Sequence, residues 1–520
     1  MKKLKLFSSV LFLSACLTAC HTGGTVDPQP DILDDVKVEK TKMNYTYSDV
    51  MNNFYKASNA IPNQGEPEIL VIPLYFLDSY SFIPENKKDL VKEDINKCFN
   101  GAKEDVGFES VTSYYSTLSC GKCNLKCKVA DWMTFDASYE EYVRDERETI
   151  TLAQTVVEQY FTTSGEDRKK YDTDNNGYLD GVVIIYAAPD ADAIANQNYS
   201  NLWAYTNWTE LAADKTNPNV CNFFWASYDF MYSAPTALSK LGNRYGSGDG
   251  SNDKLILDTH VYIHEMGHMF GLSDYYDYSY QYSPAGGFSM QDYNIASHDP
   301  FSCMSLGWCD PYIPTESCTI KLNTFQSSRD VILLTNSWNA INSPFDEYLL
   351  IEFYSPDGLN KFDHENQYFA SDRKQRRPIG PNKVGIRLWH VDARLLSAPS
   401  LRDPSKITCD PNATGKVMHA MSNTYYGNSY GRGYTTVLGR EYGNFNILQL
   451  IRNDPTETYE SSTKLDDLCL FHDGDTFTMN TFGRQFVNKA RLNDSNKVLG
   501  WSFTVKIDGE KAEIALTRRM

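Results

Sequence analysis

The chain has 520 residues, of which 41% are hydrophobic and 22% are charged, and its formal net charge is −18. Such values are typical of folded proteins and exclude a chain that is disordered throughout, while the length exceeds that of one ordinary domain. Lys and Arg are scattered without a basic stripe, which argues against nucleic-acid binding, because that requires local positive potential to neutralise phosphates.

Residues 1–20 predict a lipoprotein signal peptide. A Lys-rich start precedes an apolar run that is too short to span a bilayer. The run ends in LTAC, which resembles the bacterial lipobox, where cleavage leaves a cysteine that carries lipid. LSAC at Cys16 is a competing match, but the polar sequence after Cys20 favours Cys20 as the lipidated residue. A plain cleaved signal is the alternative, and either signal predicts a protein outside the cytoplasm.

Residues 21–65 are polar and predict a tether or a short pro-segment, with one candidate helix around Tyr47–Ala57. An apolar run rich in branched residues at Glu68–Ser79 predicts a core strand. Pro73 within that run indicates an edge position or a local bulge, because proline cannot donate a hydrogen bond to a neighbouring strand.

Helical and strand patterns alternate in the following part of the chain. Helical periodicity is present in KKDLVKEDINKCFN and at Thr149–Phe161, where Thr149 or Thr151 is a candidate N-cap. The apolar run at Gly181–Ala188 predicts a second buried strand. We therefore expect an α/β catalytic unit over residues 66–310.

The pattern then changes to short alternating segments between turns, which is typical of β-sandwiches and β-barrels. The segments are CTIKLNTF, DVILLTN, EYLLIEFY, VGIRLWHVD, GWSFTVKI and KAEIALTRR. Residues 311–520 are therefore predicted to form a β-rich, sandwich-like region, and the fold class is α+β.

The sequence HEMGH carries two histidines four residues apart. On a helix, His264 and His268 share one face and can bind one zinc ion from the same side. Glu265 points in another direction but can reach a water molecule beside the metal and act as general base. Gly271 permits the left-handed turn that ends the helix and folds the chain back, so Asp274 is predicted as the third ligand.

This layout is that of the HExxHxxGxxH zinc peptidases called metzincins, with aspartate in place of the third histidine. Asp277 is the alternative third ligand. Metzincins also have a methionine turn beneath the metal, and Met290 in GGFSMQDYN is the first candidate for it, ahead of Met304. Tyr293 is a candidate for stabilising an oxyanion, and His260 a candidate for lining the cleft. The competing interpretations are a buried helix that happens to carry two histidines and an inactive metal-binding protein.

The sequence DTDNNGYLD resembles a calcium loop, with oxygen ligands at alternate positions and Gly177 at the sharp turn. The predicted ligands are Asp172, Asp174, Asn176, the carbonyl of Tyr178, and Asp180. Val183 stands where such loops have a bidentate glutamate. A turn rich in Asp, Asn and Gly that binds no ion is the alternative.

Two further groups favour ordinary structural roles. CGKCNLKC contains Cys120, Cys123 and Cys127, but no fourth ligand follows nearby, so strand cysteines or one disulfide are expected rather than a metal cluster. His390 in LWHVD is interpreted as a strand histidine with a satisfied hydrogen bond.

The quoted motifs resemble those of the immune inhibitor A group of secreted bacterial zinc metallopeptidases. HEMGHMFGLSDYYD resembles the zinc motif of that group, and GGFSMQDYNIASHDPFSCMSLGW resembles its Met-turn block. ESVTSYYSTLSCGKCNLKCKVADWMTF, EYLLIEFY and GIRLWHVD resemble flanking segments, so the resemblance covers about residues 68–392. Ser273 stands where family members commonly have proline. The resemblance implies an extracellular endopeptidase with zinc on His264, His268 and Asp274, and with Glu265 as base.

The sequence therefore predicts a metzincin-like α/β zinc peptidase domain followed by the β-rich region, in a lipid-anchored bacterial surface protein. The expected activity is hydrolysis of peptide bonds in protein or peptide substrates, with Zn²⁺ as cofactor and Ca²⁺ as a structural ion. We expect a monomer that contacts the membrane only through its lipid. A surface binding protein or adhesin with a structural metal is the alternative from a different class.

Overall fold

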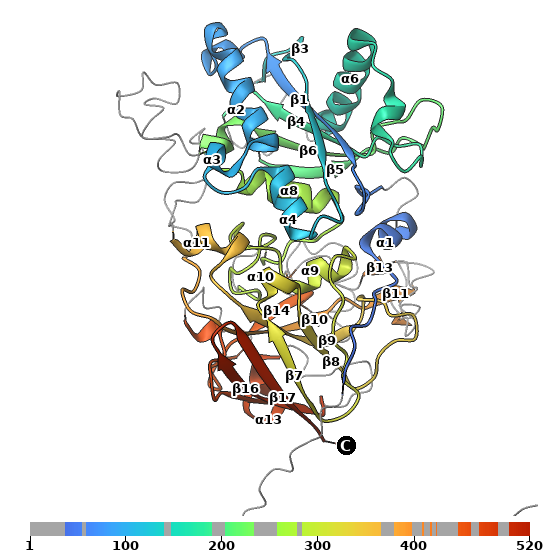
Figure 1. Ribbon diagram of the computed structural model, residues 1–520. Helices are drawn as coiled ribbons and strands as arrows, with labels where there is room; N and C mark the ends of the chain where they lie inside the picture. The colour runs from blue at the N-terminus through green and yellow to red at the C-terminus, as the bar shows by residue number, and fades with distance from the viewer. Residues whose placement is uncertain are drawn as a thin grey trace, which may run out of the picture.

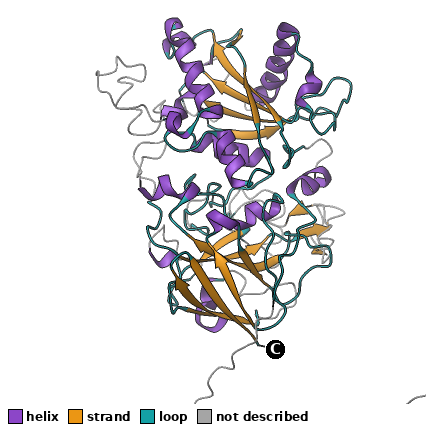
Figure 2. Cartoon of the chain, viewed as in Figure 1, coloured by secondary structure: helices purple, strands orange, loops and turns teal. Residues whose placement is uncertain are grey.

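The computed structural model shows a mixed α+β protein with several β-sheets (Figures 1 and 2). It describes residues 37–54, 59–139, 147–189, 203–232, 257–277, 283–365, 379–397, 408–409, 417–418, 423, 446–458, 467–486 and 499–519. The predicted signal peptide, including Cys16 and Cys20, lies outside these residues. Among the described helices none is long and apolar enough to cross a membrane.

The first unit is built on a six-stranded sheet in the order β2-β1-β4-β6-β5, with β3 also paired to β1. Its strands are β1 (Glu68–Phe76), β2 (Lys126–Val129), β3 (Met133–Phe135), β4 (Gly181–Tyr186), β5 (Tyr205–Trp208) and β6 (Asn222–Ser227). All neighbours are parallel except β5, which lies at one edge of the sheet and runs antiparallel to β6. We call this sheet and its helices the mixed-sheet unit.

Both faces of the mixed sheet are covered, which explains why its central strands are apolar at almost every position. In β1, Ile69 and Val71 belong to the hydrophobic cluster on one face, whereas Leu70 and Ile72 belong to the cluster on the other. Helix α6 covers the second face, and α2, α4 and α8 cover the first (Figure 1).

The described α-helices are α1 (Tyr47–Phe54), α2 (Lys88–Asn100), α3 (Lys103–Val106), α4 (Val111–Leu118), α6 (Arg147–Ser164), α8 (His260–Met269), α9 (Pro300–Ser305), α10 (Phe325–Ser328), α11 (Lys361–Glu365) and α13 (Met479–Phe482). Short 3-10 helices are η1 (Ser79–Ser81), η2 (Glu85–Lys87), η3 (Arg168–Tyr171), η6 (Tyr228–Tyr232), η7 (Gly358–Asn360), η9 (Asp467–Cys469) and η10 (Gly483–Gln485). The predicted helices near Tyr47, in KKDLVKEDINKCFN and around Thr149–Phe161 are confirmed.

Two local predictions were wrong. β1 is a central strand, so Pro73 does not mark an edge. Instead, Pro73 lies where the neighbour on one side changes: β2 pairs with β1 as far as Val71, and β3 pairs with it from Leu74 onward. The N-cap prediction also fails, because α6 begins before Thr149, at Arg147.

The second unit contains two four-stranded antiparallel sheets, in the orders β14-β10-β9-β8 and β15-β16-β17-β7. Their strands are β7 (Cys318–Asn323), β8 (Val331–Leu334), β9 (Glu347–Tyr354), β10 (Gly385–Asp392), β14 (Leu448–Ile451), β15 (Thr476–Thr478), β16 (Trp501–Asp508) and β17 (Lys511–Arg518). All six segments predicted as strands are confirmed. A small sheet is formed by β11 (Leu395–Ser397), β12 (Thr408–Cys409) and β13 (Val417–Met418).

One buried cluster lies between the two four-stranded sheets and includes Leu349, Leu388 and Phe503. The other face of the β9–β10 sheet contributes Leu350 and Trp389 to the cluster that also contains α8 and one face of the mixed sheet. The β-sandwich is therefore packed directly against the mixed-sheet unit through a shared hydrophobic core (Figure 1).

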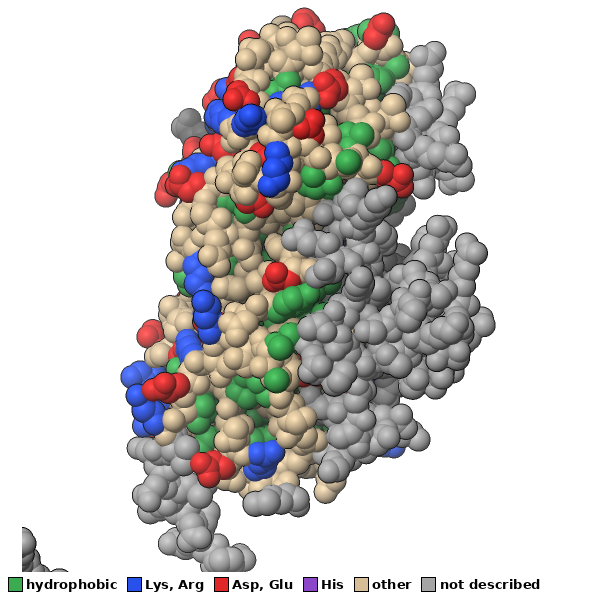
Figure 3. Space-filling view, turned by 90° about the vertical axis from the view of Figure 1, so that its right-hand side faces the viewer, with side chains coloured by type: hydrophobic (Ala, Val, Ile, Leu, Met, Phe, Trp, Pro, Cys, Tyr) green, Lys and Arg blue, Asp and Glu red, His purple; other side chains and the backbone are tan. Residues whose placement is uncertain are grey.

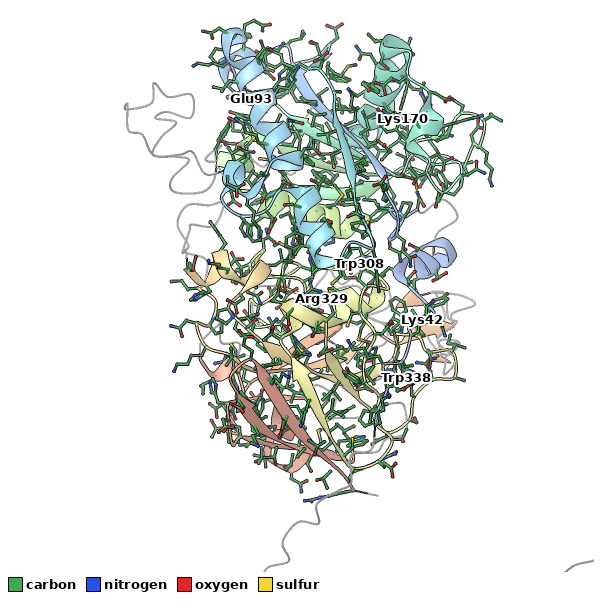
Figure 4. The ribbon with its side chains drawn as sticks, viewed as in Figure 1. Lys42, Glu93, Lys170, Trp308, Arg329 and Trp338 are labelled. Carbon is green, nitrogen blue, oxygen red and sulfur yellow. The ribbon has the colours of Figure 1, made fainter. Side chains whose placement is uncertain are left out.

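Two buried side chains labelled in Figure 4 make hydrogen bonds to the backbone of distant segments. Arg329, which follows α10, donates hydrogen bonds to the carbonyls of Thr117 (3.0 Å) and Leu118 (3.1 Å) in the last turn of α4. The indole of Trp308 donates to the carbonyl of Asn63 at 2.7 Å. Arg329 thus brings a positive charge and two donors to carbonyls at the end of a helix, where both are stabilising.

The described part of the N-terminal segment packs along the sandwich. The amide of Thr41 donates to the carbonyl of Pro311 at 2.8 Å. Tyr47 at the start of α1 is buried, with its ring edge-on to Phe345 at 5.0 Å. From Lys40 onward, the segment is therefore held by backbone hydrogen bonds and buried aromatic contacts.

Acidic and basic side chains are interspersed on the face that Figure 3 displays.

Candidate metal centre

Helix α8 presents the residues of the predicted zinc motif. The helix ends in a Schellman motif: Gly271 N–H donates to His268 O at 2.8 Å, and Leu272 N–H donates to Gly267 O at 3.1 Å. Gly271 has a φ of 102°, a left-handed conformation that favours glycine. The predicted glycine turn is confirmed, and it returns the chain toward the face that carries the histidines.

Three potential ligand atoms meet at this face. His264 Nε2 lies 3.0 Å from His268 Nε2, and each of these nitrogens lies 3.1 Å from Asp274 Oδ1. Tetrahedral zinc with bonds of roughly 2.0–2.1 Å requires ligand atoms about 3.3 Å apart, so the observed triangle is close to the required size. Asp277 is also buried, but the described residues that form this metal-ligand group are His264, His268 and Asp274.

The hydrogen bonds of the two Nδ1 atoms determine which nitrogen of each imidazole can bind a metal. His264 Nδ1 lies 2.7 Å from the carbonyl of Met290, and His268 Nδ1 lies 2.8 Å from the carbonyl of Leu272. Because a carbonyl only accepts, each Nδ1 donates its hydrogen there, so Nε2 is the nitrogen of each ring that can offer a lone pair to a metal. Two nitrogens and a carboxylate oxygen at such distances need a proton or a metal cation between them, and the type and spacing of these three donors fit a bound metal.

The pKa values of the same residues show how strongly the group favours positive charge. Burial alone would lower the pKa of His268, but the Asp274 carboxylate raises it to about 9. Burial would raise the pKa of Asp274, yet the two histidines hold it below its usual range. These shifts have the same electrostatic origin as affinity for a divalent cation.

Glu265 lies beside this group with its carboxylate buried. Burial raises its pKa, while His268 and His264 act in the opposite direction. The hydroxyl of Thr206 in β5 lies 2.9 Å from the backbone carbonyl of Glu265 and 3.1 Å from Oε2 of its side chain. Sequence reasoning missed Thr206, because no local pattern shows that β5 lies against α8.

The loop after Met290 contributes a second set of contacts that the sequence did not reveal. In the Gln291 side chain, Nε2 lies 3.3 Å from His268 Nδ1, and Oε1 lies 3.0 Å from His298 Nε2. The other ring nitrogen of His298, Nδ1, lies 2.8 Å from the Tyr114 hydroxyl. Burial lowers the pKa of His298 well below its usual range, so this ring adds no positive charge near the ligands.

Gly267, between the two histidines of the motif, leaves room for the Gln291 side chain. A Cβ atom at Gly267 would lie 2.3 Å from Gln291 Oε1 and 3.1 Å from His298 Nε2, so the Gln291 side chain would have to move. Met290 itself is fully buried, and Met304 is buried in α9. The carbonyl of Met290, rather than its side chain, makes the hydrogen bond to His264.

His260 does not line a cleft, contrary to the prediction. It is 1% exposed, its ring stacks on Phe108 at 4.4 Å, and its two nitrogens lie 2.8 Å from Asp258 and 3.1 Å from Asp363. Asp363 also accepts a hydrogen bond from the amide of Ala296 at 2.8 Å. Asp363 of α11 therefore connects the first turn of α8 to the loop that follows Met290.

Two tyrosines differ in their relation to the ligands. The ring of Tyr276 is roughly parallel to that of His264, with centroids 6.5 Å apart, and its closeness was not foreseen. Tyr293 is partly buried, and its predicted role in stabilising an oxyanion stays a prediction.

The predicted calcium loop brings together three carboxylates, from Asp172, Asp174 and Asp180, whose oxygens lie within 4.8 Å of one another. Gly177 has a φ of 93°, as the sharp turn requires. The side chain of Asn176 contacts Asp174 at 2.9 Å and accepts from the amide of Tyr178 at 2.9 Å. Burial raises the pKa of Asp180 to about 7, and both of its carboxylate oxygens accept hydrogen bonds, from the amides of Glu68 and Thr173 and from the Thr173 hydroxyl.

The remaining candidates have structural roles. Cys120, Cys123 and Cys127 are free cysteines, so the disulfide considered for CGKCNLKC is not formed: Cys120 is exposed, Cys123 is buried, and Cys127 belongs to β2. Neither of the two metal-ligand groups found among the described residues includes a cysteine. His390 pairs with Glu347 at 3.1 Å within the sandwich, as expected of a strand histidine.

No family model matches the chain, and no curated protein sequence matches it significantly.

Proposed function

We propose that the protein is a zinc-dependent endopeptidase and that His264, His268 and Asp274 hold the zinc ion. One observation carries the proposal: two Nε2 lone pairs and one carboxylate oxygen converge at 3.0–3.1 Å while both Nδ1 atoms are engaged by backbone carbonyls. Such a triad leaves a fourth tetrahedral position open, as catalytic rather than structural zinc sites do.

Other residues of the chain transfer the proton and orient the metal ligands. When bound, zinc supplies Lewis-acid chemistry that polarises a carbonyl and makes water easier to deprotonate. Glu265 takes the proton from the attacking water and delivers it to the nitrogen of the departing amine. Met290 and Leu272 hold the two imidazoles through their carbonyls, which keeps the ligand nitrogens oriented before any substrate arrives.

The proposal also covers the fold of the mixed-sheet unit. We infer a metzincin-like unit from the order of its parts: a mixed sheet with an antiparallel edge strand, a helix with two ligands, a glycine turn, a third ligand and a buried methionine. We also propose lipidation at Cys20 and a location on the bacterial surface, on the basis of the N-terminal sequence alone.

The purified protein provides the test. We expect an equimolar amount of zinc by elemental analysis, casein hydrolysis that a zinc chelator stops, and recovery when zinc is returned. The alternative, a surface binding protein with a structural metal, predicts tightly held zinc without hydrolysis of casein or of a peptide library. That result would contradict the peptidase proposal.

We also propose a structural Ca²⁺ ion in the loop of Asp172, Asp174 and Asp180, supported by three convergent hard ligands. Calcium should then raise the melting temperature, with about 2.7 kcal/mol of stabilisation at a concentration of 100 times Kd. Asp172→Asn should remove this response in a thermal unfolding assay. Asp131→Asn, an exposed carboxylate outside the loop, should retain it, and an unchanged response in Asp172→Asn would refute the site.

A further inference from the structure

Thr206 lies beside Glu265 at the candidate metal centre. It lies in β5, the antiparallel edge strand of the mixed sheet, where it pairs with Phe224 of β6. Its hydroxyl lies within hydrogen-bond distance of both the carbonyl oxygen and the side-chain Oε2 of Glu265, at 2.9 and 3.1 Å. A single strand residue thus contacts the residue proposed as base at two atoms.

The position of this hydroxyl is restricted from several sides. Threonine is β-branched, so a strand backbone leaves its side chain few rotamers. Residues two apart in a strand point to the same face, and Trp208 accordingly extends from β5 to donate to the carbonyl of Asn59 at 3.0 Å. Asn59 O also accepts from Asn222 of β6 at 3.0 Å, so the strand is anchored beyond its own pairing.

The two Glu265 oxygens near Thr206 differ in how much they depend on its hydroxyl as a hydrogen-bond donor. Its backbone carbonyl lies within α8, where helical geometry offers it the amide four residues later. Its side-chain carboxylate is buried, and a buried carboxylate requires donors if it is to stay in one orientation. The Thr206 hydroxyl has one proton to donate, and a hydrogen bond to a charged acceptor is the stronger of the two choices.

We propose that Thr206 is a positioning residue that holds the Glu265 carboxylate in the orientation needed for proton transfer. This inference rests on the proposed peptidase function. Thr206 keeps its own proton throughout and touches neither ligand nor substrate in this role. Its contribution is to limit rotation of the carboxylate, so the energy of the hydrogen bond appears in kcat rather than in KM.

The test compares the isosteric change Thr206→Val with the same change at Thr209, three residues further along the chain. Thr206→Val removes the hydroxyl and preserves the shape. We expect kcat to fall about 10- to 100-fold, the range for one hydrogen bond to a charged group, with little change in KM and an unchanged zinc content. Thr206→Ser restores the hydroxyl and should recover most of kcat.

Thr209→Val is the matched control. Thr209 follows β5, is buried, and donates its hydroxyl to the carbonyl of Val220 at 2.5 Å, so the control removes a buried threonine hydrogen bond away from Glu265. It should reduce stability without reducing kcat. Wild-type kcat in Thr206→Val, failure of Thr206→Ser to rescue, or an equal loss in Thr209→Val would each overturn the positioning role. If the wild-type protein hydrolyses no peptide, the proposed function itself fails, and the role of Thr206 fails with it.

Discussion

Glu265→Gln should abolish peptide hydrolysis while zinc stays bound. Glutamine has almost the same shape as glutamate, and its amide oxygen can still accept a hydrogen bond from Thr206, but it cannot take a proton from water at neutral pH. General-base catalysis typically contributes about 10²- to 10⁴-fold, so the loss in kcat should be at least of that order. Initial rates on a fluorogenic peptide measure the loss of hydrolysis, and the zinc content of the variant shows whether the metal stays bound.

Glu93→Gln is a suitable control, because Glu93 lies on the exposed side of α2, where it pairs only with Lys97 among the described residues (Figure 4). It makes the same chemical change away from the centre and should leave the rate unaltered. Substantial residual activity in Glu265→Gln would exclude this glutamate as the base. Loss of zinc from that variant would instead show that Glu265 supports the ligands.

Breaking the buried ion pair between Arg387 and Glu352 should be the largest single loss of stability among the changes considered. Both side chains are completely buried on neighbouring strands, β10 and β9, and they contact each other directly. Glu352 also accepts from the indole of Trp389 at 2.9 Å. Glu352→Ala leaves the Arg387 charge uncompensated in the core, which typically costs about 3–5 kcal/mol.

The same change should also affect the metal centre. The Arg387 guanidinium lies over the ring of Phe288 at 4.2 Å, and Phe288 is two residues before Met290, whose carbonyl holds His264. We therefore expect weaker zinc binding in Glu352→Ala, measured by chelator competition, together with a lower urea midpoint. This effect would show that the sandwich supports the centre.

Two variants check the explanation. A double variant, Glu352→Leu with Arg387→Met, removes both buried charges and should recover much of the stability, because well-packed apolar residues often replace a buried pair at little cost. Glu513→Ala breaks exposed cross-strand ion pairs in β17 and should change the urea midpoint little. If the double variant is no more stable than Glu352→Ala, the loss comes from packing rather than from an unpaired charge.

Local sequence patterns predicted most elements correctly because each pattern has a direct physical cause. Branched apolar runs such as Gly181–Ala188 form central strands that are buried on both faces, and alternating segments form sandwich strands with one face in the core. The histidine spacing and Gly271 likewise specify a helix face and its termination through local geometry.

The errors occurred where the outcome depends on a distant segment. Pro73 is compatible with a central strand only because the neighbouring strand changes there from β2 to β3, which no feature of its own sequence indicates. His260 has the spacing of a residue next to a metal site, yet Asp363, some hundred residues later, encloses it. The contact of Thr206 with Glu265 depends in the same way on the order of strands in the sheet.

The sequence by itself determined which residues can act as metal ligands, because their spacing on a helix and across a glycine turn is a local property. It also determined that the C-terminal region is β-rich. Only the tertiary structure decided that Asp274 rather than Asp277 meets the two histidines, and that Met290 and Leu272 orient their rings. Those relations depend on how the chain returns over α8 and packs on the sandwich, which is set by contacts between residues far apart in the sequence.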